Sequence, residues 1–343
     1  MATTFAVPDG RVAMAATLYT GTGATLAVSN AVNTVSFQPD FVWMKGRSGA
    51  TDHALYDSVR GTTFDLVSNS TAAETTQTTG LTTFGAAGFT VGALAKVNTS
   101  AATYVGWNWK AGGTAVSNTA GTITSSVSAN TDAGFSVVTY TGNGVNSTMG
   151  HGLGVAPAMI FYKSRSNAEG WPVYHSALAV ANNLALSNTN AQQPNGNIYW
   201  NSTAPTATLI RAGTDTGNNG SGYTYVAYCW APVAGYSAFG SYTGNGSADG
   251  PFVYTGFRPR FVMIKRTDGI GNWWMFDTSR STYNVAVQYL IADTSAVEGS
   301  DNAIDVLSNG FKLRLATYQP NTSGATFIYA AYAENPLRYS NAR

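Results

Sequence analysis

Two groups of charged residues with nearly the same spacing are the arrangement in this chain most suited to chemistry. They consist of Lys45, Arg47, Asp57 and Arg60, and of Lys265, Arg266, Asp277 and Arg280. Such groups could take part in catalysis, or they could pair as ions across neighbouring strands and fix the register of a sheet. In a related stretch between them, His175 and Leu178 replace the acid and the second arginine together. Joint loss is expected of ion-pair partners, and we therefore predict a structural ion-pair cluster.

These residues belong to a sequence unit that occurs three times. The turn Tyr-Thr-Gly-x-Gly begins at Tyr19, Tyr140 and Tyr242. A lysine lies six residues after each of Pro39, Pro157 and Pro259, namely Lys45, Lys163 and Lys265. Fourteen residues after the same prolines lie His53, Trp171 and Trp273. A shared spacing of this length indicates one supersecondary unit used three times.

The apolar segments of the chain are typical of strands. They are short, rich in Val, Ile, Tyr, Phe and Thr, and bounded by Gly, Asn, Ser and Pro. We predict an all-β protein of three tandem antiparallel β-sandwich repeats, jelly-roll-like or immunoglobulin-like in topology. The expected division is a first repeat in 1–112, a polar linker in 113–134, a second repeat in 135–234, and a third repeat in 235–343 that ends in a short tail.

Composition excludes several classes of partner. Charged residues make up 10% of the chain, and 18 basic residues face 17 acidic ones for a net charge of +1. No sustained field exists to attract nucleic acid or an anionic membrane. No apolar stretch is long enough to predict membrane insertion, and the first residues lack the pattern of a signal peptide. We expect a protein that is not exported by a signal-dependent route.

Other candidates for chemistry are weak. The three histidines, His53, His151 and His175, lack metal-ligand spacing, and the single cysteine, Cys229, is expected in the core. The stretch His151–Gly154 resembles part of an oxyanion loop but has no nucleophile elbow beside it. Acidic residues gather in the third repeat, where turn positions and solvated charges explain them. We expect no catalytic residue, no metal and no cofactor.

Aromatic residues are the stronger candidates for binding. Four tryptophans lie in loop-flanked positions, unlike those of the closing strands: Trp171, Trp200, Trp273 and Trp274. Exposed aromatic rings among Asn, Ser and Gly can stack on sugars or anchor a protein interface. We predict that these four contribute surface contacts, including contact with a host-surface glycan, although core positions would explain about half of them equally well.

The repeated motifs also resemble a known group of proteins. The turns at Tyr140 and Tyr242, the stretch from His151 to Pro157 and the stretch 256–266 are similar to a family of uncharacterised repeat proteins encoded by tailed bacteriophages. The similarity extends over nearly the whole chain, and it supplies no catalytic residues. It implies a virion structural protein, commonly interpreted as a tail-fibre or other surface component.

We therefore expect a non-enzymatic protein of a phage particle, assembled in the bacterial cytoplasm and exposed on the virion surface as a tail or fibre-associated component. Its expected partners are other virion proteins and copies of itself, with a trimer as the first expectation. Decoration of the capsid surface is the alternative, because the sequence lacks the heptads or Gly-x-y repeats of a fibre shaft. A depolymerase and a cellular glycan-binding module rank below both.

Overall fold

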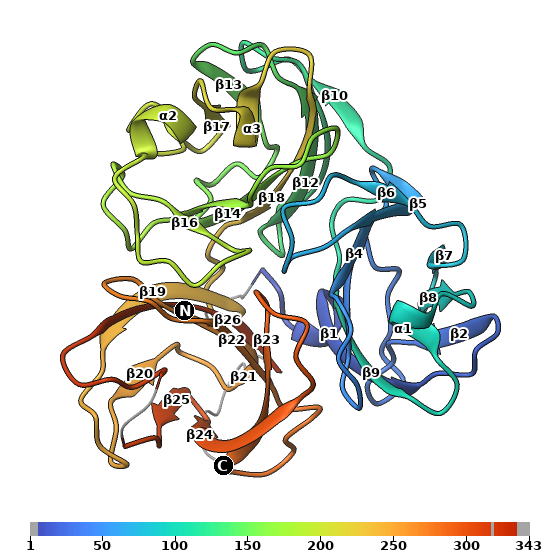
Figure 1. The fold of residues 1–343 in the computed structure, drawn as a ribbon, viewed down its shortest axis with the longest axis vertical. Coiled ribbons are helices and arrows are strands. Elements are labelled where there is room, and N and C mark those ends of the chain that lie inside the picture. Colours follow the sequence, from blue (N-terminus) through green and yellow to red (C-terminus); the bar gives the residue numbers. More distant parts are fainter. Residues whose placement is uncertain (1–5, 317–318, 335–343) are drawn as a thin grey trace.

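The computed structural model describes residues 6–316 and 319–334 and is built almost entirely of antiparallel sheets. Strands account for 44% of the residues and helices for 5%, so the predicted all-β class is confirmed. The chain forms three lobes arranged as a triangle around a common centre (Figure 1). We call them region 1 (6–112), region 2 (113–234) and region 3 (235–334). The tail at 335–343 lies outside the described residues.

Region 1 holds a six-stranded sheet in the order β1-β9-β3-β4-β5-β6 and a second sheet in the order β2-β8-β7. Its elements are η1 (Gly10–Val12), β1 (Met14–Thr20), β2 (Leu26–Ser29), β3 (Phe41–Gly46), β4 (Ala54–Asp57), β5 (Gly61–Leu66), β6 (Thr75–Thr76), β7 (Leu81–Gly85), β8 (Gly88–Val91), α1 (Ala95–Asn98) and β9 (Thr103–Trp109).

Region 2 holds a seven-stranded sheet in the order β10-β11-β12-β18-β14-β15-β16 and a smaller sheet of β13 and β17. Its elements are β10 (Val116–Asn118), β11 (Ser125–Asn130), β12 (Phe135–Thr141), β13 (Ser147–Gly150), β14 (Met159–Ser164), β15 (Pro172–His175), β16 (Leu184–Ala185), α2 (Gly196–Trp200), β17 (Leu209–Ala212), α3 (Thr216–Asn219) and β18 (Thr224–Trp230).

Region 3 differs from regions 1 and 2, because its strands form one sheet instead of two. Its eight strands follow one another as β19-β26-β21-β22-β23-β24-β25-β20, and the sheet curls until it is nearly closed. They are β19 (Ser237–Thr243), β20 (Phe252–Tyr254), β21 (Pro259–Arg266), β22 (Trp273–Asp277), β23 (Ala286–Ile291), β24 (Gly299–Leu307), β25 (Gly310–Leu313) and β26 (Thr326–Ala333).

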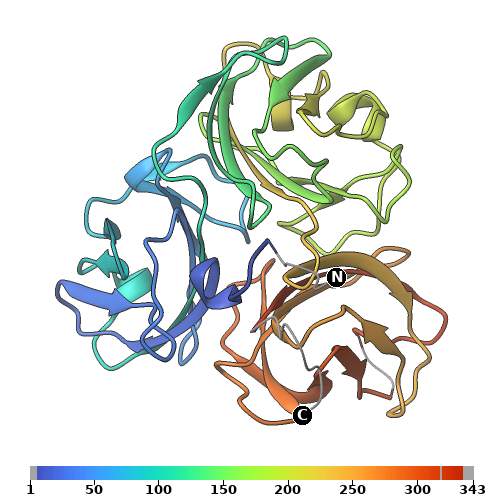
Figure 2. The ribbon, with the colours of Figure 1, turned by 180° about the vertical axis from the view of Figure 1, so that it is seen from behind.

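The predicted linker at 113–134 is corrected in part, because β10 and β11 within it belong to the sheet of region 2. β10 pairs with β11, and β11 pairs with β12 through partners such as Val127 and Val138. Region 2 therefore follows region 1 without a free connector, as the rear view also shows (Figure 2).

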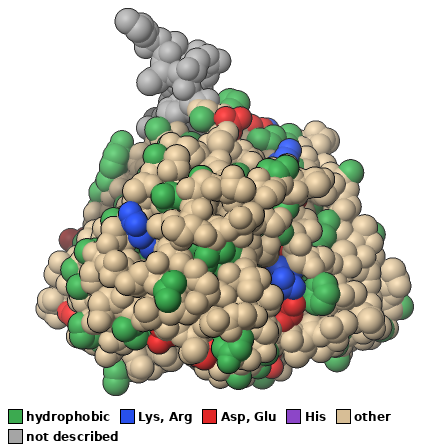
Figure 3. Space-filling view, turned by 90° about the horizontal axis from the view of Figure 1, so that it is seen from above, with side chains coloured by type: hydrophobic (Ala, Val, Ile, Leu, Met, Phe, Trp, Pro, Cys, Tyr) green, Lys and Arg blue, Asp and Glu red, His purple; other side chains and the backbone are tan. Residues whose placement is uncertain are grey.

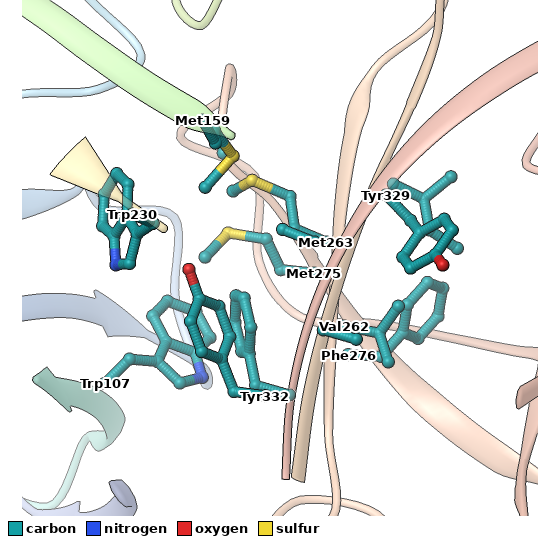
Figure 4. Close-up of a cluster of buried hydrophobic side chains, with 14 of the residues drawn as sticks. Trp107, Met159, Trp230, Val262, Met263, Met275, Phe276, Tyr329 and Tyr332 are labelled. Atoms are coloured by element: carbon teal, nitrogen blue, oxygen red, sulfur yellow. The ribbon is translucent and has the colours of Figure 1, made fainter. Parts of the chain in front are cut away.

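Each large sheet is buried on both faces. The central strands β3, β14 and β18 have almost no exposed residue, because successive side chains point alternately into their own lobe and towards the centre of the triangle. Figure 4 shows this for region 3: Met263, Met275 and Tyr332 face Trp107, Met159 and Trp230 of the other lobes, whereas Val262, Phe276 and Tyr329 lie on the opposite side.

Aromatic pairs join the lobes at all three boundaries. Phe41 of region 1 stacks on Tyr228 of region 2, with ring centroids 4.3 Å apart. The rings of Phe161 and Trp273 lie 6.2 Å apart between regions 2 and 3, and those of Trp107 and Phe261 lie 5.7 Å apart between regions 1 and 3. The centre of the molecule is therefore one continuous apolar core shared by the three lobes.

A buried asparagine explains why the turn Tyr-Thr-Gly-x-Gly recurs. Asn98, Asn219 and Asn321 are fully buried, and the side-chain oxygen of each accepts the backbone N–H of the residue after the first glycine. The second glycine of every turn has a φ between 64° and 76°, which favours glycine. These three asparagines were not singled out in the sequence, although each lies 76 residues after the turn residue whose N–H it accepts.

Candidate functional site

The recurrent polar residues meet at the boundaries between lobes. The three lysines Lys45, Lys163 and Lys265 are completely buried. Each ammonium group donates to a backbone carbonyl of its own lobe and to at least one of the preceding lobe: Lys45 to Ser295 (3.3 Å), Lys163 to Thr71 (3.0 Å), and Lys265 to Thr189 (3.1 Å) and Asn190 (2.9 Å). Burial lowers the pKa of each lysine to about 8.

The position fourteen residues after each proline also joins two lobes. Nε1 of Trp171 donates to the carbonyl of Val67, and Nε1 of Trp273 donates to that of Ala185, each at 2.9 Å. In region 1 the equivalent His53 places Nε2 at 2.9 Å from the carbonyl of Ile291. Its Nδ1 accepts the indole N–H of Trp43, so Nε2 carries the proton. A hydrogen bond from a ring N–H to a backbone carbonyl of the neighbouring lobe is therefore present at all three boundaries.

Two of the boundaries contain the predicted ion pairs. Asp57 pairs with Arg60, and Asp277 pairs with Arg280, with all four side chains completely buried. Each carboxylate accepts a further hydrogen bond from an aromatic residue of the next lobe. The donors are the Tyr228 hydroxyl to Asp57 at 2.7 Å and the Trp107 indole N–H to Asp277 at 3.0 Å. The ion pairs therefore connect lobes as well as strands.

A glutamate extends each pair to a second arginine. Glu74 bonds Arg60 within region 1 and Arg165 of region 2, both at 2.8 Å. Glu298 bonds Arg280 within region 3 at 3.2 Å and Arg47 of region 1 at 2.8 Å. Each of these two boundaries therefore holds a chain of acid, arginine, glutamate and arginine.

The third boundary, between regions 2 and 3, has lost this whole chain. Its five equivalent residues are His175, Leu178, Gln192, Thr267 and Ala330. The backbone is unchanged: the N–H of Gln192 donates to the carbonyl of Thr267 as those of Glu74 and Glu298 do to Arg165 and Arg47. His175 is neutral, because its Nδ1 accepts the N–H of Ala177 at 3.1 Å and burial lowers its pKa to about 4.

The predicted cluster is thus confirmed in part. Asp57 with Arg60 and Asp277 with Arg280 form buried pairs, and Arg47 joins the second pair through Glu298. Lys45 and Lys265 bond backbone carbonyls, and no carboxylate bonds them among the described residues. Arg266 pairs locally with Asp268. The two acid–arginine pairs lie at different boundaries, and Arg47 of the first sequence group meets the pair of the second group through Glu298.

The prediction that four tryptophans form surface contacts is wrong for this chain. Trp171, Trp200, Trp273 and Trp274 are at most 2% exposed. Trp171 and Trp273 are boundary residues, and Trp200 lies inside region 2 with its N–H on the carbonyl of Val180. The sequence misled because turn residues flank these rings. A neighbouring lobe distant in the chain covers Trp171 and Trp273, and region 2 itself encloses Trp200.

His53, His151 and Cys229 are buried. Burial lowers the pKa of His53 to about 3 and also lowers that of His151, whereas burial raises that of the Cys229 thiol. In residues 6–316 and 319–334, no three His, Cys, Asp or Glu side chains are grouped so that they could hold a metal ion. None of the helices in that part of the chain has the length and apolar character needed to cross a membrane.

The structure exposes aromatic residues that the sequence did not single out. Tyr283 is 85% exposed and Tyr254 64% exposed, both in region 3. Tyr283 borders a hollow of about 590 Å³. Most of the surface seen in Figure 3 consists of uncharged side chains and backbone, with few charges scattered over it. Surface recognition by this protein must therefore rest on a small number of local features.

Comparison with known proteins gives a family but no activity. A family model described as a domain of unknown function, DUF7483, matches residues 12–336. No curated protein matches the chain. The match spans all three lobes.

Proposed function

The chain belongs to the family of domains of unknown function DUF7483, and from that premise we propose that it is a structural protein on the surface of a bacteriophage particle. We place it in the tail apparatus, as a fibre-associated component that takes part in contact with the host surface. It is assembled in the bacterial cytoplasm and has no catalytic role. The support comes from how the polar residues are used and from the resemblance of the repeated motifs to phage repeat proteins.

The observation that carries the proposal is the burial of the recurrent charged residues at the lobe boundaries. Residues that could do chemistry, such as Lys45, Asp57 and Arg60, are 0 to 5% exposed and bond partners within the chain. They hold three lobes in one rigid body. The burial of the few charged residues between lobes is expected of a protein whose role depends on a fixed shape.

We infer that the lobes are three copies of one unit derived from a β-sandwich. The orders β1-β9-β3-β4, β12-β18-β14-β15 and β19-β26-β21-β22 correspond strand for strand. The turns, lysines and ring N–H bonds fall at matching places in each. On this interpretation the curled sheet of region 3 is a variant in which the two layers have joined through β23 and β24.

Capsid-surface decoration is the second candidate. It is favoured by the compact triangular outline of the chain, which carries no shaft in its described part (Figure 1). Other virion proteins are the proposed partners in both cases, and copies of the chain assemble as a trimer. Light scattering during size-exclusion chromatography measures this state directly, and a mass of one chain would refute the trimer.

Antibody labelling of intact particles tests the location. We expect gold-labelled antibody against this chain to bind purified particles at the tail. Label spread over the shell would contradict the tail assignment and favour decoration of the capsid. Particles that carry no label, while the chain is abundant in the infected cell, would refute a virion role altogether. An antibody against the major shell protein serves as the control for particle integrity.

A further inference from the structure

Arg260 is the least satisfied charged residue in the described part of the chain. Its side chain is 3% exposed, Nε has no hydrogen-bond partner, and no carboxylate forms an ion pair with it. The residue lies in β21 where the pairing with β26 shifts register between Pro259 and Phe261. Bulges of this kind redirect a side chain and are frequent at functional sites.

The side chain borders a hollow between regions 1 and 3. The hollow has a volume of about 480 Å³ and is lined by Arg260, by Thr278, Ser279 and Thr282 of the loop after β22, and by residues 29–33 of region 1. It shares Thr282 and Glu334 with the 590 Å³ hollow beside Tyr283. The two hollows therefore adjoin, and we call them together the groove; Arg260 lines one of them and Tyr283 the other.

The nearby carboxylates are already neutralised by other arginines. Glu334 pairs with Arg258 and also accepts from the Thr278 hydroxyl at 3.2 Å. Asp9 pairs with Arg11, and Asp277 pairs with Arg280. Because each of these carboxylates already pairs with another arginine, the positive charge of Arg260 is left without an ion-pair partner at the groove. A buried guanidinium without a partner is costly, and an anionic group from outside would remove that cost.

The equivalent positions in the other lobes show that the fold does not require this charge. Region 2 has Ala158 there, which is buried. Region 1 has Asp40, which is also buried, but it accepts hydrogen bonds from the Ser58 hydroxyl at 2.8 Å and from the N–H of Ala111 at 2.8 Å. Only at Arg260, among these three positions, is the polar group left open to a ligand.

The rest of the groove matches a polyhydroxylated ligand. Its walls carry hydroxyl and amide groups, from Thr282, Ser308 and Asn309 among others. Tyr283 stands at the border with its ring 85% exposed, which is suited to stacking on the face of a sugar. A guanidinium binds carboxylate in a bidentate manner.

We propose that the groove between regions 1 and 3 binds an acidic saccharide, with the carboxylate of the sugar on Arg260 and its ring against Tyr283. This inference deepens the proposed host-surface contact by naming a ligand class, and it rests on that function only for its biological role. The two fail separately, since labelling of particles tests location and binding by the isolated chain tests the groove.

Isothermal titration calorimetry with three probes, namely glucuronate, methyl glucoside and inorganic phosphate, tests the groove on the full chain. Sodium glucuronate should bind and methyl glucoside should bind more weakly, because the neutral sugar lacks the group that Arg260 holds. Arg260→Ala should weaken glucuronate binding about tenfold or more, the loss expected for a hydrogen bond to a charged group. Tyr283→Ala should weaken both sugars and leave the fold intact, because the ring is exposed.

Arg314→Ala is the matched control, since it removes one positive charge from region 3 at a side chain that is 38% exposed and pairs with Asp305. It should bind glucuronate like the unaltered chain. Equal glucuronate affinity in the Arg260→Ala and unaltered chains would overturn the proposal, as would absence of binding by the unaltered chain. Binding of inorganic phosphate without binding of glucuronate would overturn the saccharide assignment. If Arg260→Ala fails to fold, an unchanged affinity in Tyr283→Ala overturns it instead.

Discussion

The boundary between regions 3 and 1 and the boundary between regions 2 and 3 solve the same packing problem with different chemistry. The first buries Asp277 and Arg280 and continues through Glu298 to Arg47. The second has the neutral His175 and the partly buried Leu178 at the corresponding places. Both keep the buried lysine and the ring N–H bond to the neighbouring lobe.

The difference shows that the ionic chain is replaced as a whole. Its loss at one boundary also removes the aromatic donor, because Ala330 stands where Trp107 and Tyr228 donate to the carboxylates elsewhere. A buried charge without its partner is strongly unfavourable, whereas a fully apolar or neutral replacement is tolerated. We infer that the ionic chains direct which lobe faces which, and that the shared apolar core supplies most of the stability.

The largest effect is expected from breaking one ionic chain. Arg280→Leu leaves Asp277 buried without its partner, and we expect a loss of about 3–5 kcal/mol in the free energy of unfolding. The reverse substitution at the boundary between regions 2 and 3, Leu178→Arg, should lower the free energy of unfolding much less, because the side chain at position 178 is only partly buried. Urea unfolding of both variants measures the contrast, and equal losses would contradict it.

A second substitution should restore part of the stability that Arg280→Leu removes. Arg280→Leu combined with Asp277→His copies the neutral boundary, and about 1–2 kcal/mol of the loss should return because no carboxylate is left unpaired at position 277. A loss in the double variant equal to the sum of the two single losses would show that the residues do not act as a unit.

The neutral boundary should respond to acid through His175. Burial lowers its pKa to about 4 and that of His53 to about 3, whereas in the unfolded chain both titrate near 6.5. As the pH falls below 6.5 the unfolded chain binds protons that the native chain does not, so stability decreases by about 1.4 kcal/mol per pH unit for each histidine.

Urea unfolding between pH 7 and 5 measures this slope, above the range in which most carboxylates titrate. His175→Gln should make the slope shallower by about the share of one histidine. A slope identical to that of the unaltered chain would mean that His175 is protonated equally in both states. His53→Gln at the other boundary should have a similar effect, which makes it the matched comparison.

The smallest effects should be the same at both kinds of boundary. Trp273→Phe removes the N–H bond to Ala185 between regions 2 and 3, and Trp171→Phe removes the bond to Val67 between regions 1 and 2. Each carbonyl loses one donor, and we expect a cost of about 1 kcal/mol in either case. Melting curves of the two variants, recorded side by side, would contradict the shared role if only one variant were destabilised.

Much of the candidate site could be predicted from the sequence, because residues that recur at equal spacing mark equivalent positions. Equal spacing from Pro39, Pro157 and Pro259 picked out the lysines, the ring N–H donors and the two acid–arginine pairs. The joint replacement at His175 and Leu178 correctly indicated that acid and arginine are partners. The burial of Trp171 and Trp273 could not be found this way, since these rings bond Val67 and Ala185, each in another lobe.

Arg260 was missed for a related reason. It differs from its counterparts Asp40 and Ala158, and a search for recurrence passes over a residue that occurs once. Its significance lies in the missing partner, which depends on how Glu334 and Asp277 are already paired. Only the coordinates contain that information.

The sequence by itself determined the strand-rich class and the recurrent spacing of residue types, because short-range pattern and composition fix local structure. The tertiary structure decided that the lobes close into a triangle, that Trp171 and Trp273 are interior, and that β10 and β11 within 113–134 join a sheet. These outcomes depend on contacts between residues that are distant in the chain. The free energy gained by burying an apolar surface depends on which other part of the protein packs against it.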